Sequence, residues 1–443
     1  MNSCVSLEIN KMAASLTRSH SKATAEIPSF LALADSPSWQ TARTENQILR
    51  AVPYDRWEQL EAEIPAWEAI LDHNPSLSIF STPEWLGSWW KAFGSNKRTS
   101  ILTFAGADNS MMGLLPAYLE EFQSPFFTRL TGLRLVGDGT GDSDNLDLIV
   151  RPGFEKACAQ GLVSWLKHHK HWDVCFLNTM PRNSRAAAAL VRELDRVHWP
   201  YVLESFPNSA IELPDSWLLY VESLSPSFRP LLTRYPRRLA QRYQVRIRRC
   251  ENPDELSRKL KILFSLHKKR WNLVNQPGSF GCRERREFYF AMGPSFLSKG
   301  WLEFWLMELN GVPAAAQYCF RYRNTVSILQ EGFDPKFAVD KPGYALRAAM
   351  LKHFIETGVR RYDFLGGLAA HKHNWGAKPG AYLNLRFARP GSAGSLYLSC
   401  TNSMAKSKEW LRVHLPASAW NVLHRIKINF SKRQAASPFG LGA

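Results

Sequence analysis

Two short stretches of the chain have the composition of a phosphate-binding turn. Arg151-Pro152-Gly153-Phe154 and Lys341-Pro342-Gly343-Tyr344 each place a basic residue and a Pro-Gly turn before an amphipathic stretch of about four helical turns. In both copies an aspartate follows the glycine by 20 residues, at Asp173 and Asp363. A helix that begins at such a turn presents unpaired amides and a partial positive charge, which suit the pyrophosphate of a nucleotide-like cofactor.

The repeat predicts an internal duplication of a helix followed by a strand, although the apolar residues of the two helices lie out of register. In the second copy, the predicted pyrophosphate cradle consists of Lys341 and the amides of Gly343, Tyr344 and Ala345. The alternative is a plain Pro-Gly turn that caps a helix. The first copy is followed by Asn178-Thr179-Met180-Pro181, without a basic loop, so we expect only the second half to bind such a cofactor.

Composition excludes several classes of protein. The chain has 443 residues, of which 45% are hydrophobic and 12% aromatic, enough for a large core and two globular units. It contains neither an apolar run of about 18 residues nor the order of a secretory signal, which predicts a cytoplasmic protein. The seven cysteines form no C-x-x-C pair, so we expect reduced thiols, no disulfide framework and no metal site.

The net charge of +17 is concentrated in one segment. Residues 225–286 contain 17 Lys and Arg against 4 Asp and Glu, a net charge of +13. Within it, Arg237, Arg238 and Arg242 follow helical spacing and are candidate substrate-binding residues in a cleft between the two units. Such a field suits an anionic ligand or substrate, namely a nucleotide-linked sugar, a phosphorylated lipid headgroup or an acidic polysaccharide. A solvated basic surface and an RNA-binding surface are the alternatives, whereas DNA is not an expected partner.

Pattern changes along the chain predict four segments. These are a disordered lead over 1–45, a first unit over 46–222, a second unit with a basic helical connector over 223–390, and a basic tail over 391–443. Within the units we expect a helix capped by Ser81-Thr82 and a hairpin at Asn310-Gly311. The expected strands are 101–105, 113–118, 146–150, 174–177, 301–309, 312–322 and 325–333. The tail is predicted to dock on the second unit as a helix, with contact to a membrane surface as the alternative.

An ordered set of motifs over about residues 50–390 carries a resemblance to a known family. The motifs are Pro83-Glu84-Trp85-Leu86 with Trp89-Trp90, Leu135-Val136-Gly137, Asp144 to Asp147, the Arg-rich segment, Gly332-Phe333-Asp334-Pro335, Pro342-Gly343, Tyr362-Asp363-Phe364-Leu365-Gly366 and Lys372 with Trp375-Gly376. In this order they resemble the CelD/BcsL-like acyltransferases, which are relatives of the GNAT superfamily and similar to Fem-type peptidoglycan transferases.

The resemblance implies an α/β fold with mixed sheets, arranged as two tandem GNAT-like domains. It also implies acetyl-CoA or another acyl-CoA as donor, an amino or hydroxyl group of a sugar-containing acceptor, and a role in surface polysaccharide or cellulose synthesis. One alternative is a Fem-like transferase that uses aminoacyl-tRNA. The other is a non-catalytic cationic scaffold that binds polysaccharide.

Acyl transfer requires a held donor, a base for the nucleophile and stabilisation of the oxyanion. We expect Asp334 to be the base, with a turn-forming role as its alternative. Asp363 is expected to have a structural role or to orient the substrate. The resemblance implies that Lys372 contacts the substrate's phosphate or the reacting carbonyl. His371 is an acid-base candidate, and Trp375 is a candidate for substrate binding. His353, on an apolar helical stripe, is expected to be a core histidine.

Overall fold

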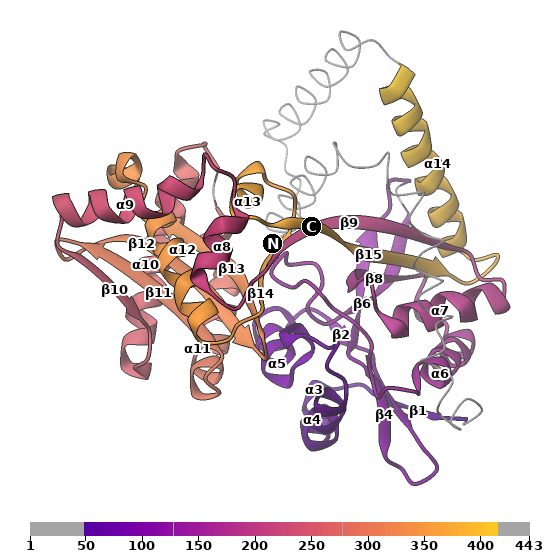
Figure 1. Cartoon of the computed structure of the whole chain (residues 1–443). Helices are drawn as coiled ribbons and strands as arrows, with labels where there is room; N and C mark the ends of the chain where they lie inside the picture. Colours follow the sequence, from indigo (N-terminus) through magenta and orange to yellow (C-terminus); the bar gives the residue numbers. More distant parts are fainter. Residues whose placement is uncertain (1–47, 127, 277, 415–443) are drawn as a thin grey trace, which may run out of the picture.

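The computed structural model describes residues 48–126, 128–276 and 278–414, so the predicted lead lies outside the described residues (Figure 1). The first half consists of β1 (Arg50–Tyr54), α3 (Trp57–Glu61), α4 (Ile64–His73), η4 (Ile79–Ser81), α5 (Pro83–Phe93), β2 (Arg98–Thr99), β3 (Ile101–Ala105), β4 (Met111–Leu115), β5 (Ala117–Gln123), β6 (Arg129–Leu135), β7 (Ile149–Val150), α6 (Glu155–His168), β8 (Val174–Pro181), α7 (Arg185–Arg196) and β9 (Tyr201–Glu212). The remainder consists of α8 (Trp217–Ser223), α9 (Arg229–Arg242), β10 (Val245–Arg249), α10 (Pro253–Asn272), η5 (Ser279–Gly281), α11 (Arg283–Ser298), β11 (Leu302–Leu309), β12 (Val312–Tyr322), β13 (Thr325–Phe333), η6 (Pro335–Asp340), α12 (Pro342–Glu356), β14 (Arg361–Gly366), α13 (Ala370–Asn374), β15 (Lys378–Ala388) and α14 (Ala393–His414).

The duplication inferred from the Pro-Gly repeat is present as two β-α-β units. Strands β6 and β8 are parallel neighbours with α6 between them in sequence, and β13 and β14 have the same relation across α12. The helices start at different points: α6 begins two residues after Gly153, whereas α12 begins at Pro342. This offset accounts for the apolar stripes being out of register.

The two halves share one sheet of eleven strands in the order β10-β11-β12-β13-β14-β9-β15-β8-β6-β5-β2. Strand β9 belongs to the first half by sequence but pairs with β14, while β15 returns from the second half to pair with β8. Figure 1 shows β9 and β15 running side by side between the halves. The exchange crosses the boundary that we placed at residue 222, and it joins the two units through backbone hydrogen bonds.

Local elements follow the expected signals where a turn or a cap defines them. Asn310 and Gly311 both have positive φ, 51° and 77°, as a type I′ hairpin requires, and they join β11 to β12. Thr82 caps α5 by accepting a hydrogen bond from the Trp85 amide. The expected strand over 113–118 is instead two strands separated at Pro116, because proline cannot donate to the ladder. Of the strand expected over 146–150, Ile149–Val150 remains.

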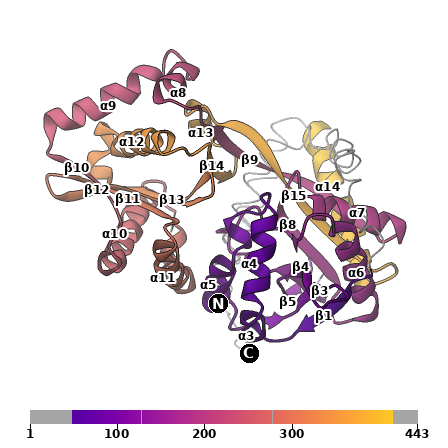
Figure 2. The ribbon, with the colours of Figure 1, turned by 60° about the horizontal axis from the view of Figure 1, so that its bottom comes forward.

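The helices cover both faces of the second half in layers. Figure 2 shows α9 lying over α12 on one face of the sheet, with α10 and α11 on the other. Helix α11 packs against α5 of the first half, where the buried Trp85 ring lies 5.1 Å from Phe288 and 5.2 Å from Phe320. The halves therefore share a hydrophobic core. We expected the Arg-rich segment to lie in a cleft between the units. The structure instead places helix α9 on the outer face of the second half, beside α12.

A buried ion pair ties the loop of residues 137–147 in the first half to α11. Arg285 Nε lies 2.7 Å from an Asp142 oxygen, the Asp142 side chain is 0% exposed, and the same guanidinium donates to the Thr140 carbonyl. Burial raises the pKa of Asp142, and the Arg285 charge counteracts this effect.

Replacing Arg285 should destabilise the fold, because the buried Asp142 carboxylate would be left without a counter-charge. We expect Arg285→Met to lower the free energy of unfolding by about 3 kcal/mol, because Asp142 would lose its counter-charge in a dry site. Adding Asp142→Asn should recover part of the loss, and Arg258→Met, on the surface of α10, should change stability little. Urea unfolding of the four proteins measures this, and equal stability of all variants would contradict the pairing.

The C-terminal helix docks on the first half. Leu398 of α14 is buried with Val174, Phe176 and Ala388 of the first-half sheet, whereas Trp410 and Leu411 near its end are exposed. For the described part of the tail, docking on the second unit was therefore a wrong expectation, since the returning β15 carries the helix to the first half. Residues 415–443 lie outside the described residues. Among the described helices, none combines the length and apolarity that a membrane span needs.

Candidate active site

The second β-α-β unit opens where its parallel strands separate. Strands β13 and β14 pair over Thr325–Ser327 and Arg361–Asp363 and then diverge, so the two strand ends form the arms of a V. The β13 arm leads through η6 into the start of α12, and the β14 arm ends at Gly366. Beyond Ser327 the β13 backbone groups that face β14 have no strand partner on that side among the described residues. They are available to an extended ligand that contains amides.

The start of α12 is open at the predicted glycine. A Cβ on Gly343 would meet nothing within 4 Å, and Lys341, at φ 55°, turns the chain into the helix. The amides of Tyr344 and Ala345 donate to the Lys341 carbonyl at 3.1 and 3.3 Å. These two amides are therefore not available to a phosphate in this structure. Within the described residues the Gly343 amide has no acceptor. Of the three predicted cradle amides, it is therefore the one that can still donate a hydrogen bond to a phosphate.

The equivalent helix start in the first half is occupied by the chain itself. Glu155, the first residue of α6, is buried, and its Oε2 accepts a 2.8 Å hydrogen bond from the Gly153 amide. Burial raises the pKa of Glu155, while hydrogen bonds from the Glu155 and Gly153 amides lower it. A carboxylate at this position takes the place that an anion would need. This arrangement supports the predicted asymmetry between the copies.

The far arm of the V is held by one residue from each half. Asp144 Oδ2 accepts a hydrogen bond from the Gly366 amide at 2.8 Å, and Lys372 Nζ donates to the Gly366 carbonyl at 2.9 Å. Three further carbonyls, of Phe364, Leu365 and Gly367, lie 3.0–3.4 Å from the same ammonium. Since an ammonium has three N–H donors, these carbonyls saturate it. In this structure Lys372 therefore positions the end of β14.

The pKa values of Asp144 and Lys372 are shifted in opposite directions at this junction. Burial raises the pKa of Asp144 to about 6, with the Gly366 amide and Lys372 lowering it and Asp363 raising it further. Burial lowers the pKa of Lys372 to about 8, against the raising effect of Asp144 and Asp363. Near pH 7 Asp144 is largely ionised and Lys372 largely protonated. A partly exposed carboxylate with such a pKa suits a general base.

A second charged cluster lies deeper between the arms. Glu331 of β13 pairs with Arg347 of α12 and, at 2.9 Å, with Arg270 of α10. Burial would raise the pKa of Glu331, but the two guanidinium groups and His371 lower it to about 2. Burial lowers the pKa of His371. Glu331 is thus a fixed anion that orients two arginines and is too weak a base to take a proton near pH 7.

The predicted base Asp334 instead shapes the turn before η6. Its Oδ1 accepts the Lys336 amide at 3.0 Å and its Oδ2 lies 2.5 Å from Lys269 Nζ. Burial would raise the pKa of Asp334, but these contacts bring it below its ordinary value. The turn-forming role matches this geometry, whereas both carboxylate oxygens are engaged and the pKa is too low for efficient proton abstraction.

The other predicted residues fall into two groups. Asp363 is buried, accepts the Leu365 amide at 2.8 Å, and has its pKa raised by burial against the lowering effect of Arg361. It therefore supports the β14 arm beside Asp144. Trp375 is 0% exposed and packs against Phe228 and Tyr344, so direct contact with substrate is a wrong expectation for its indole.

Arg237, Arg238 and Arg242 all lie on α9. Arg238 and Arg242 pair with Asp340, just before the α12 start. The structure places them beside the start of α12 and not at the junction of the two halves.

Sequence reasoning did not single out Asp144, Glu331 or Arg347 as site residues. For Asp144 a signal was present, because three aspartates fall within Gly141–Asp147, a density that a simple turn does not need. For Glu331 and Arg347 no local signal exists, since each looks like an ordinary charged residue of a strand or a helix.

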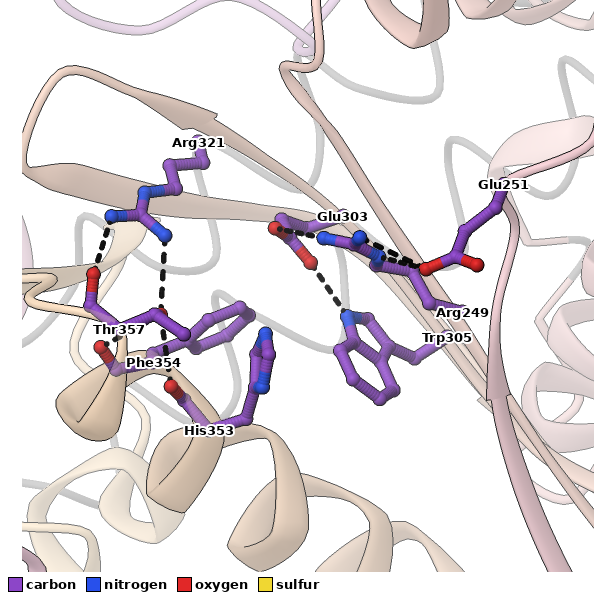
Figure 3. Close-up of polar contacts among 8 residues, drawn as sticks. All are labelled: Arg249, Glu251, Glu303, Trp305, Arg321, His353, Phe354 and Thr357. Atoms are coloured by element: carbon purple, nitrogen blue, oxygen red, sulfur yellow. Dashed lines mark hydrogen bonds and ion pairs between the residues drawn. The ribbon is translucent and has the colours of Figure 1, made fainter.

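His353 confirms the simpler expectation of a packed histidine. It is partly buried, with its ring 5.1 Å from Trp305 and 5.9 Å from Phe354 (Figure 3). Trp305 Nε1 donates to Glu303, which also pairs with Arg249 at 3.2 Å. This group braces β10, β11 and α12. No cluster of three or more His, Cys, Asp or Glu side chains suited to a metal is found over the described ranges.

Comparisons with known proteins identify a family for part of the chain and solved structures with a similar fold. Residues 226–373 match the family described as acetyltransferase (GNAT) domain. Among solved structures, FemX is 11% identical, with a TM-score of 0.51 and coverage of 72% of this chain and 95% of FemX. L-PGS from Bacillus licheniformis (12% identity, TM-score 0.45, 76% and 96% coverage) and a tandem GNAT protein of the clavulanic acid pathway (12%, 0.41, 78% and 99%) are also similar. No curated protein sequence matches the chain.

Residues 226–373 therefore match a GNAT acetyltransferase domain, which supports an acyltransferase, and the chain has a mixed α/β fold similar to that of FemX. The predicted fold class is confirmed. The resemblance to the CelD/BcsL-like family remains a prediction.

Proposed function

We propose that the protein transfers an acetyl or other acyl group from acyl-CoA to an amino or hydroxyl group of a sugar-containing acceptor, in the synthesis of a surface polysaccharide. The observation that carries the donor assignment is the α12 start, with the Gly343 amide unpartnered and the space beside it empty, at the mouth of the diverging β13 and β14. Helix dipole and amide favour the pyrophosphate there. The pantetheine arm can then extend along the part of β13 that is not paired with β14.

Asp144 is our candidate for the general base. One of its oxygens is held by the Gly366 amide, and the other has no hydrogen-bond partner within the described ranges. In the proposed reaction the acceptor nitrogen or oxygen attacks the thioester carbonyl, and its proton passes to Asp144. The carbon–sulfur bond then breaks and CoA leaves as a thiolate, which takes a proton from solvent. Lys372 keeps the strand end in place during this step.

The proposal locates the acceptor at the junction of the halves, because its base comes from the first half and its donor from the second. Asn145, next to Asp144, is partly exposed and donates through Nδ2 to the buried Tyr382 hydroxyl at 3.2 Å, so its side-chain amide is a polar group that this side offers to a sugar. We place the reaction in the cytoplasm, where acyl-CoA is supplied.

A direct assay of donor use tests this function. The purified protein is incubated with acetyl-CoA and a panel of amino and hydroxy sugars, and thiol release is measured together with product mass. We expect thiol and acetylated sugar to appear in equal amounts. No thiol release above background with any acceptor class would reject acyl-CoA as donor.

Aminoacyl-tRNA is the second candidate donor, and the cationic helix α9 beside the donor site favours it, since exposed arginines attract nucleic acid. The same assay with charged tRNA separates the two. Loss of the aminoacyl ester with no consumption of acetyl-CoA would replace the first proposal with this one.

A further inference from the structure

Helix α9 crosses the start of α12 at a defined point. Tyr235 of α9 lies 5.7 Å from Tyr344, and Arg238 Nε lies 3.2 Å from an Asp340 oxygen. Arg237, between these two contacts, and Arg234, adjacent to Tyr235, therefore lie near the turn that leads from Asp340 to Tyr344. Figure 2 shows the same relation, with α9 running over α12. That turn contains Gly343, whose amide is the proposed hydrogen-bond donor to the pyrophosphate.

The arginines at this crossing form a stripe whose positive charge is balanced by few nearby carboxylates. Arg234, Arg238 and Arg242 are spaced by four on one face of α9, and Arg237 lies next to them. Arg238 and Arg242 share the single charge of Asp340, which also accepts from the Tyr243 hydroxyl at 2.9 Å. Arg234 and Arg237 are exposed and make no ion pair with a described carboxylate. Lys341 adds another exposed cation.

This arrangement divides the arginines into two tasks. Arg238 and Arg242 hold Asp340 and so fix the turn that presents the Gly343 amide. Arg234 and Arg237 are left as guanidinium groups directed to solvent at the mouth of the same site. A guanidinium that has no carboxylate partner and stands beside a phosphate site is suited to bind a second phosphate, because its planar N–H groups match the oxygens of a phosphate monoester.

We propose that Arg234 and Arg237 form a second anion subsite, which binds the terminal phosphate monoester of the donor, the 3′-phosphate of CoA. This inference rests on the proposed function, and it assigns part of the Arg-rich segment to the donor instead of the acceptor. The stripe then distinguishes a full CoA thioester from the same thioester without that phosphate. Helix α9, which precedes the first strand of the second half, is thus a specificity element of the donor site.

Two ligands and three proteins test the subsite without need for turnover. Calorimetric titration compares CoA with dephospho-CoA, which lacks the 3′-phosphate, on the full-length protein, on an Arg234→Ala/Arg237→Ala variant, and on an Arg246→Ala/Arg248→Ala control. The control removes the same charge from exposed arginines of β10, in the same basic segment.

The original protein and the control should bind CoA at least about tenfold more tightly than dephospho-CoA, and the α9 variant should bind both alike and as weakly as the original protein binds dephospho-CoA. Equal binding of the two ligands by the original protein would overturn the subsite while leaving the donor site intact. Binding of neither ligand would reject the proposed donor itself. An equal loss of CoA affinity in both double variants would show a general effect of net charge and would also overturn the assignment.

Discussion

The Asp144→Asn variant should lose at least about a hundredfold in kcat with little change in the KM for the acyl donor. Asparagine can still accept the Gly366 amide that Asp144 holds at 2.8 Å, so the strand end keeps its position, but it cannot take a proton from the acceptor. General base catalysis contributes about 10²–10⁴ in rate, which sets the expected loss. Steady-state kinetics with acetyl-CoA and the best acceptor measures it.

The same loop offers a matched control for that substitution. Asp147 lies three residues further on, and its Oδ1 accepts from the Leu148 amide and the Ser184 hydroxyl, both at 2.8 Å, within the first half. Burial raises the pKa of Asp147 to about 7, so Asp147→Asn makes the same chemical change in a similarly buried carboxylate. It should leave kcat within a few-fold. If both variants lose activity equally, the effect comes from the loop as a whole and Asp144 is not the base.

The pH dependence of kcat/KM gives an independent check on the same assignment. Asp144 has a raised pKa of about 6, so activity should rise as pH increases through 6 and the carboxylate ionises. Lys372 has a lowered pKa of about 8, so activity should fall as pH increases through 8 and the ammonium releases the Gly366 carbonyl. The groups that face Asp144 are Asp363, Lys372 and the Arg285-paired Asp142, so the two limbs belong to a coupled cluster. The acidic limb should disappear in the residual activity of Asp144→Asn.

The second large effect concerns the donor cradle. Gly343→Glu should weaken CoA binding by at least about a hundredfold without lowering the melting temperature. A Cβ at this position meets nothing within 4 Å, and a carboxylate in the first helical turn favours the helix by about 0.3–1 kcal/mol. The same carboxylate should repel the pyrophosphate and can accept from the helix-start amide, as Glu155 accepts from Gly153 at the start of α6. Calorimetry with CoA and a thermal melt provide the two measurements.

Two further variants make that result specific. Gly343→Ala adds a methyl group into empty space, so it should change CoA affinity only slightly. Glu155→Gln removes the carboxylate of the first half but should leave one CoA bound per chain, because the Glu155 side chain still fills the site. Normal CoA binding by Gly343→Glu would show that the pyrophosphate lies elsewhere and would remove the basis of the donor assignment.

The sequence was enough to predict where the candidate site lies, but not which of its groups are free to act. The Pro-Gly helix start at Gly343 was placed correctly, because a proline at the first helical position and a glycine beside it are signals carried by adjacent residues. The amides of Tyr344 and Ala345 were not available, since the turn at Lys341 brings its carbonyl within reach of both. Asp334 satisfied the residue type for a base, but its contact with Lys269 comes from a helix 65 residues away.

The amino-acid sequence by itself determined the elements whose signals are local: the capped helix α5, the Asn310-Gly311 hairpin, the two Pro-Gly units and the concentration of arginines on α9. These depend on backbone preferences and spacing within a few residues. Tertiary structure decided which of them meet. Asp144 and Gly366 are 222 residues apart, and they come together because β9 and β15 exchange between the halves and Arg285 anchors the loop that carries Asp144. Such pairings follow from core packing and strand order, which local periodicity does not encode.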